Sequence, residues 1–302
     1  MTTVSAGIPS GPATVDTDGE LADDTRQLTP AERRRRMLWK VLGALASAVL
    51  VLFIVGPLIW LALAAFSDQW TAPRLLPQSW TLDWWKTVLD QPELVESFWR
   101  SLQFALIATA VSAAICLPAA YALGRTKFPG RRVVLIGLFA TNAFPKMGLY
   151  TSIATLFYAM NLMNTGTAIV IVQLLGTIVT MVWIPAAAFA SVPPSLLEAA
   201  RDAGAGPLRT FFSITLRQAI PGIAVALILA FLACFDEAQG TYLVKPGSYS
   251  TMPTMMYTLV ENYPAQAAAV FAIALTIPSV LLLLAVRKYI LGGHLAEGFQ
   301  IK

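Results

Sequence analysis

The chain has 302 residues, of which 57% are hydrophobic and only 13% are charged, whereas soluble domains carry about 25% charged residues. Its formal net charge is small, because 21 Lys and Arg stand against 17 Asp and Glu to give +4. This composition excludes a water-soluble globule and indicates a protein that folds in a lipid bilayer.

Six stretches of the sequence are apolar enough to cross a bilayer, which takes about 20 residues of helix. One of them contains a charge at Lys146, and another contains two, at Asp236 and Glu237. We therefore predict an all-α membrane protein with six transmembrane helices, in one domain of residues 29–302. The predicted spans are residues 41–66, 102–124, 133–159, 167–190, 220–243 and 265–287.

Positive charges are distributed unequally between the two sides of these spans. Sixteen Lys and Arg residues fall on the side of the N-terminus and four on the other side, with Lys146 inside a span. Cytoplasmic loops carry the excess of Lys and Arg, so the N-terminus is predicted to be cytoplasmic, and an even number of spans returns the C-terminus there. Residues 1–28 are polar and rich in Ser, Thr, Asp, Gly and Pro, which is typical of a disordered tail.

Several polar side chains fall within the predicted spans. An ionisable group at the centre of a bilayer costs about 2.5 to 3.5 kcal/mol by insertion scales, which makes it a functional candidate. We expect Lys146 to lie near Asp236 or Glu237, either on a polar path through the membrane or in an ion pair that serves packing. The neutral candidates, which could bind a hydroxylated solute or a neighbouring helix, are Asn142, Gln173, Gln239 and Tyr242.

The sequence shows no catalytic constellation. It has no cluster of nucleophile, base and metal ligands, and no Gly-x-x-x-x-Gly-Lys-Ser/Thr loop that would hold phosphates. Cys116 and Cys234 are the two cysteines, and they match no metal or disulfide spacing. We expect no catalytic residue, metal or nucleotide on this chain. A secondary transporter with an ion site at Asp236 or Glu237 is an alternative, although six spans without an obvious inverted repeat would be few for that class.

The connection at residues 191–219 is patterned. Residues 195–198, Ser-Leu-Leu-Glu, follow two prolines and have the form of a capping box, which predicts the start of a helix. Residues 204–207, Gly-Ala-Gly-Pro, predict the end of that helix and the start of another. The sequence therefore predicts two short helices joined by a glycine hinge, which either dock on another protein or lie on the membrane surface.

This loop resembles the EAA signature of membrane subunits of ATP-binding-cassette (ABC) importers. Residues 198–200 are Glu-Ala-Ala, and Gly204, Ile214 and Leu216 follow at the spacing of the signature, whereas Arg217 stands where the family usually has proline. The resemblance implies a type I ABC importer transmembrane domain, in which the loop contains the coupling helix that docks on a cytoplasmic ATPase. The docking residues that it implies are Glu198, Ala199, Ala200, Arg201, Asp202 and Gly204.

The six-span layout and the Gly-rich ending at residues 287–298 are similar to the smaller permease of carbohydrate importers of the maltose-system type. This resemblance implies a prokaryotic cell-membrane protein whose partners are a second homologous permease subunit, a cytoplasmic ATPase dimer that binds ATP and Mg, an extracytoplasmic solute-binding protein and membrane lipid, with no nucleic acid. It implies a sugar or polyol as the solute. Residues 235–237, Phe-Asp-Glu, and Met252-Pro253 are also similar to polyamine permeases, so a small cation is an alternative solute.

Overall fold

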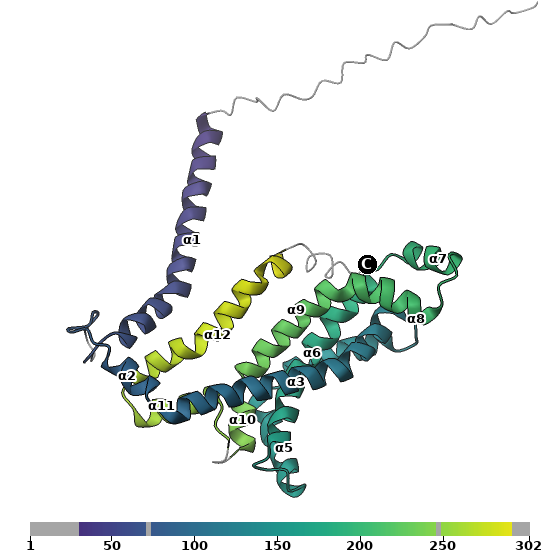
Figure 1. The fold of residues 1–302 in the computed structure, drawn as a ribbon. Coiled ribbons are helices and arrows are strands. Elements are labelled where there is room, and N and C mark those ends of the chain that lie inside the picture. The colour runs from purple at the N-terminus through teal and green to yellow at the C-terminus, as the bar shows by residue number, and fades with distance from the viewer. Residues whose placement is uncertain (1–29, 71–73, 246–248, 292–302) are drawn as a thin grey trace, which may run out of the picture. The chain divides into compact units, whose positions relative to one another are not determined.

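The computed structural model describes residues 30–70, 74–245 and 249–291, and within these ranges the chain is helical apart from turns and one antiparallel bridge between Ser67 and Trp80 (Figure 1). The predicted disordered tail, residues 1–28, and the last part of the Gly-rich ending, from residue 292, lie outside the described residues. The described residues divide into two units between Pro57 and Leu58.

Five helices in the described part of the chain are long and apolar enough to cross a membrane. Each of them overlaps a span predicted from the sequence. They are α1 (Pro30–Ala65), α3 (Pro92–Arg125), α6 (Gly166–Ala190), the continuous helical stretch Pro207–Phe235, and α12 (Ala265–Leu291).

The predicted third span, residues 133–159, is not one continuous helix. It consists of α4 (Arg131–Ala140), a 3-10 turn η1 (Thr141–Ala143) and α5 (Lys146–Ala159), with a bend of 97° between the two halves. The cause is Pro145, because proline disfavours the helical conformation of the residue before it, and Phe144 is extended at φ −76 and ψ 137. The chain therefore has a broken span or a re-entrant segment at this position.

The predicted fifth span, residues 220–243, also differs from the structure. The helix stops at Phe235, and the chain resumes as a separate short helix α10 (Gln239–Val244). The helix also begins earlier than predicted, since α8 (Pro207–Thr210) runs through a π-helical turn η2 (Phe211–Thr215) into α9 (Leu216–Phe235). The second helix after the glycine hinge is therefore the start of a transmembrane helix and not a short helix of its own.

The core of the second unit forms where α3, α6 and α9 pack together (Figure 1). Small residues bring their backbones close, as is common between membrane helices. A Cβ atom on Gly124 of α3 would lie 2.5 Å from the backbone oxygen of Ala186 on α6, and one on Gly222 of α9 would lie 2.5 Å from the Cβ of Ala188. These contacts fix the distance between the three helices.

Two short helices cover one end of this core. They are α2 (Asp83–Leu89) and α11 (Met252–Asn262), which pack against α3 and α12. The backbone N–H of Met252 donates to the Ser101 hydroxyl on α3 over 2.7 Å. The side chain of Trp85 on α2 donates to the Ala65 carbonyl at the end of α1 over 2.9 Å. Neither short helix was predicted from the sequence.

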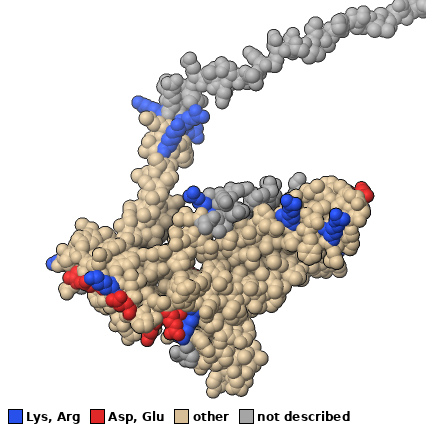
Figure 2. All heavy atoms as spheres, viewed as in Figure 1, with Lys and Arg blue, Asp and Glu red and all other residues tan. Residues whose placement is uncertain are grey.

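The outer surface of the helices is apolar. Within residues 34–57, large side chains such as Leu52 and Phe53 are 69% and 79% exposed. A soluble protein rarely exposes so large an apolar area, whereas lipid tails cover it at no cost. In residues 58–302, Figure 2 shows a face that is almost free of charge between two charged ends. This distribution is that of a bundle with hydrocarbon around its middle.

Candidate functional site

The patterned connection between α6 and α9 folds as a helical elbow, which we define as residues 194–210. It begins with α7 (Pro194–Asp202), and the N-cap is Pro193. The predicted capping box at residues 195–198 was wrong: no side chain caps α7, because Pro194 has the φ of a first helical residue and starts the helix one position early. Upstream, the Arg125 guanidinium donates to the Val192 carbonyl over 2.9 Å and holds the start of the elbow against the end of α3.

The C-terminal end of α7 is closed by a Schellman motif. The N–H of Ala205 donates to the carbonyl of Ala200 over 2.9 Å, and the N–H of Gly204 donates to the carbonyl of Arg201 over 2.8 Å. Gly204 has φ +77, a conformation that side chains other than hydrogen disfavour. The predicted glycine stop is thus present, and glycine is required there by the backbone.

The residues of the EAA signature divide into two groups on α7. Ala200 is buried, and α7 packs on α8 and η2. The other candidates are exposed and form what we call the docking face: Glu198, Ala199, Arg201, Asp202 and Gly204. Among the residues that the structure describes, no ion pair involves these three charged side chains. Their charges are therefore available to another molecule.

A second candidate site is a cavity of about 680 Å³ beside the middle of α6 and the C-terminal end of α9, away from the elbow. Six helices and the chain between α9 and α10 contribute to it. Its lining is Lys146 and Tyr150 of α5, Gly176 of α6, Leu232 and Ala233 of α9, Asp236, Glu237 and Ala238, Gln239 of α10, Tyr257 of α11, and Leu275, Thr276, Ser279 and Leu283 of α12.

Four of the polar candidates predicted from the sequence line this cavity: Lys146, Asp236, Glu237 and Gln239. Lys146 is the first residue of α5, where the helix dipole disfavours a cation, and the two carboxylates in the same cavity offset that cost. No ion pair joins Lys146 to either carboxylate within the described part of the chain. Lys146, Asp236 and Gln239 are exposed, so the cavity is open to the surface.

Glu237 holds α10 in place. Its carboxylate accepts from the N–H groups of Gly240 and Thr241 over 2.9 and 2.8 Å, and from the Thr241 hydroxyl over 2.8 Å. A carboxylate at this position satisfies backbone donors at the start of a helix that would otherwise lack partners. Glu237 is therefore committed to local structure, whereas the Asp236 carboxylate forms no hydrogen bond to a described residue and is the freer of the two acids.

The remaining three candidates do not line the cavity. Asn142 is exposed on η1. Gln173 is 2% exposed in the bundle core, where its side-chain oxygen has no partner in the described structure. Tyr242 is 49% exposed on α10 and lies against Tyr257, with 5.1 Å between ring centroids.

Sequence reasoning missed Tyr150, Tyr257, Thr276 and Ser279 in the cavity lining. Tyr257 belongs to α11, whose start carries a recognisable signal: Thr251 and Thr254 form a capping box, with Pro253 between them in the first turn. The capping box and the proline together could have predicted the helix. Nothing in the sequence indicates that α11 packs near α10.

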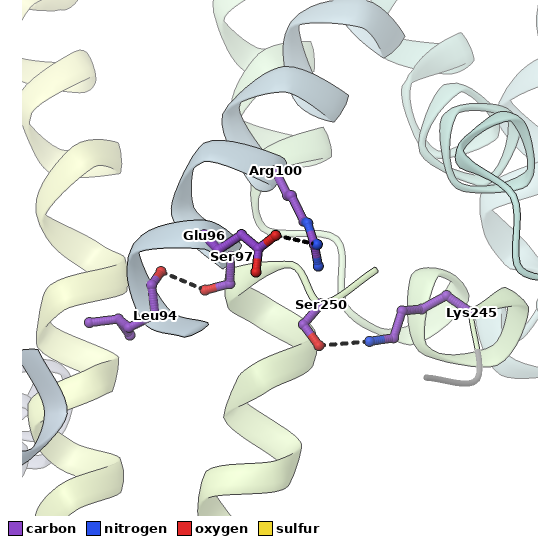
Figure 3. A network of polar contacts seen from close by, with 6 residues as sticks. All are labelled: Leu94, Glu96, Ser97, Arg100, Lys245 and Ser250. Carbon is purple, nitrogen blue, oxygen red and sulfur yellow. Dashed lines mark hydrogen bonds and ion pairs between the residues drawn. The ribbon is translucent and has the colours of Figure 1, made fainter. Parts of the chain in front are cut away.

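A cluster of charged residues lies where α3 begins (Figure 3). Arg100 forms an ion pair with Glu96 and lies 5.7 Å from the ring centroid of Tyr249. Lys245, just after α10, is buried and donates to the Ser250 hydroxyl over 2.8 Å. Burial lowers the pKa of the Lys245 ammonium, and the positive charge of Arg100 lowers this pKa further. Keeping Lys245 charged at this buried position therefore costs free energy of folding.

The fold and the two sites together define a class of protein. A helical membrane bundle, with an exposed elbow where α6 leads into α9 and a polar cavity beside the middle of α6 and the C-terminal end of α9, has the features expected of a membrane transport component. Residues 114–291, more than half of the chain, match the family described as binding-protein-dependent transport system inner membrane component. The chain belongs to this family.

Curated relatives match almost the whole chain. It is 29% identical to the maltodextrin permease MdxG of Bacillus subtilis, over 87% of this chain and 97% of the relative. It is 24% identical to the trehalose permease SugB of Mycobacterium tuberculosis, over 86% of this chain and 96% of that relative. It is 26% identical to the trehalose/maltose permease MalG of Thermococcus litoralis, over 86% and 95%.

Solved structures share the fold. A chain of a bacterial importer of the polysaccharide alginate superposes with a TM-score of 0.64 at 20% identity, over 85% of this chain and 98% of that chain. A chain of the MetNI methionine transporter superposes with a TM-score of 0.55 at 19% identity, over 65% of this chain and 93% of that chain. The prediction of an all-α ABC importer membrane domain is confirmed.

Membership of this family confirms the predicted class of function. The chain is the permease subunit of an ABC importer, a multi-span protein of the cell membrane that works with a solute-binding protein and an ATPase, and it is not itself the ATPase. The resemblance to the carbohydrate permeases of the maltose type is confirmed by the relatives above.

Proposed function

We propose that this chain is the permease subunit of an importer of oligosaccharides. The observation that carries this proposal is its similarity, over at least 85% of its length, to permeases named for maltodextrin, trehalose, diacetylchitobiose and galactooligosaccharides. The similarity extends over several saccharides, so it supports the class of solute and not one sugar.

In the proposed assembly, the chain forms half of the pore with a second homologous permease subunit. The docking face contacts a cytoplasmic ATPase dimer, which holds ATP and Mg, and this chain binds no cofactor. Both termini are cytoplasmic, which the excess of Lys and Arg on the N-terminal side supports. An extracytoplasmic binding protein delivers the solute to the opposite side of the membrane.

The elbow and the cavity are connected by two rigid elements. The elbow follows the end of α6 and continues into α9, and these two helices reach the cavity through Gly176 and through Leu232 and Ala233. Closure of the ATPases would move the elbow, and packed helices transmit such a movement as rigid bodies. In this mechanism ATP hydrolysis changes the opening of the pore and leaves the solute chemically unchanged.

The experiment is transport by the complete complex, with its binding protein and ATPase, reconstituted in vesicles. Maltotriose, trehalose and the polyamine putrescine are supplied separately. The proposal expects ATP-dependent accumulation of a saccharide. Accumulation of putrescine alone would contradict the solute class, and solute uptake driven by an ion gradient without ATP would contradict the mechanism.

A further inference from the structure

The cavity combines an aromatic surface with hydrogen-bonding groups on neighbouring elements. Tyr257 lines it and is 39% exposed, and Tyr242 lies next to Tyr257 with an interplanar angle of 53°. Leu232, Leu275 and Leu283 provide apolar lining. The volume of about 680 Å³ is within the range of about 300 to 1,000 Å³ that small-molecule sites occupy.

The polar groups of the cavity include both donors and acceptors. The Asp236 carboxylate accepts only, the Lys146 ammonium donates only, and the Gln239 amide does both. These three side chains are exposed and form no hydrogen bond to a residue that the structure describes. The hydroxyl of Thr276 donates to the carbonyl of Ala272 over 2.7 Å, which leaves its oxygen able to accept.

This mixture of groups fits a saccharide better than a polyamine. A sugar ring has an apolar C–H face that can lie on an aromatic ring, and its hydroxyls both donate and accept. A polyamine is a multiple cation that would gain from the Asp236 carboxylate, and less from the Glu237 carboxylate, which already accepts three hydrogen bonds from Gly240 and Thr241. It would be repelled by Lys146 in the same cavity. An ammonium group in a site selective for cations would be an unfavourable like charge.

We propose that this subunit itself contacts the transported saccharide in the cavity, with Tyr257 as the surface on which a sugar ring lies and Asp236 and Gln239 as partners of its hydroxyls. The inference rests on the proposed function for the class of solute. It adds that this chain takes part in selecting the solute and does not only complete the pore wall.

The test measures the concentration dependence of maltotriose transport by the reconstituted complex, with variants of this chain. Tyr257→Ala removes the ring and should lower kcat/KM about 2- to 10-fold, which corresponds to about 0.4 to 1.4 kcal/mol. Tyr257→Phe should retain most of the activity, because the ring is kept. Asp236→Asn and Gln239→Ala should each lower kcat/KM for maltotriose. Co-purification of the ATPase measures the assembly of each variant.

Tyr158→Ala is the matched control, since Tyr158 is an exposed tyrosine of α5 outside the cavity lining, and it should leave transport unchanged. Equal kcat/KM for the unmodified chain, Tyr257→Ala and Gln239→Ala would overturn the inference while leaving the proposed function intact. If the unmodified complex accumulates putrescine and no saccharide, the proposed function fails, and the assignment of Tyr257 to a sugar ring fails with it.

Discussion

At the scale of single residues, Gly204 determines how the elbow turns. Its φ of +77 places it in the left-handed region, which costs a residue with a side chain about 1 to 2 kcal/mol. We expect Gly204→Ala to destabilise the Schellman motif by about this amount and to lower the ATP hydrolysis that solute stimulates. The measurement is solute-stimulated ATPase activity of the assembled complex, together with its thermal midpoint.

Gly206, two residues further along, is a matched control for this prediction. It has φ −68, and a Cβ atom added to it would meet no atom within 4 Å, which is also true of Gly204. Gly206→Ala should therefore leave stimulated ATPase activity unchanged. Equal effects of the two substitutions would show that the left-handed turn at Gly204 is not what matters in the elbow.

Lys245 is a residue whose charge is costly in the fold. Because its pKa is lowered in the folded chain, the unfolded chain binds more protons between that pKa and the ordinary value near 10.5, so stability should rise with pH in this window. Lys245→Met should raise the thermal midpoint at pH 7.5, and its advantage should shrink at pH 10. An advantage that is the same at both pH values would contradict this account.

At the scale of the elements, the contact between α3 and α6 depends on a missing side chain. A Cβ on Gly124 would lie 2.5 Å from a backbone oxygen and 2.9 Å from the Cβ of Phe189, so Gly124→Ala forces the helices apart. Such overpacking costs about 1 to 3 kcal/mol. We expect a lower thermal midpoint of the purified complex and weaker association with the ATPase, because the displaced end of α6 leads into the elbow.

Gly137 on α4 provides the comparison for Gly124. It has no atom within 4 Å of a Cβ position, and Ala favours a helix over Gly by about 1 kcal/mol. Gly137→Ala should leave the midpoint unchanged or raise it. If Gly124→Ala were as harmless as Gly137→Ala, the close packing of α3 on α6 would not contribute to stability.

The apolar stretches of the sequence predicted the positions of the long helices better than the positions of the breaks in them. The five long helices follow from runs of apolar residues, because lipid requires continuous backbone hydrogen bonding. The bend at Pro145 had a visible cause, but proline is also common in straight spans, so its presence alone did not predict 97°. The stop after Phe235 depends on the hydrogen bonds of Glu237 to α10, which no local pattern indicates.

The two candidate sites also differ in how far the sequence could predict them. The elbow could be read from consecutive residues, because a helix start and a glycine stop are local features. The cavity is built from side chains that are up to 137 positions apart, as Lys146 and Leu283 show. Charge alone identified Lys146 and Asp236, since ionisable groups in a span are costly. Tyr257 could not be identified, because tyrosine is ordinary at membrane interfaces.

At the scale of the whole molecule, the central claim is that the elbow docks on the ATPase and passes its movement along α6 and α9 to the cavity. The measurement that tests this most directly is thiol crosslinking in the assembled complex. The native Cys116 and Cys234 are buried, so an introduced surface cysteine would be the accessible thiol of this chain. Ala199 on the docking face and Asn262 at the end of α11 are both exposed and serve as test and control positions.

We predict that Ala199→Cys crosslinks to the ATPase subunit with a yield that changes when ATP is added, whereas Asn262→Cys gives no such product. A complex that hydrolyses ATP and transports solute without any crosslink from Ala199→Cys to the ATPase would contradict the account.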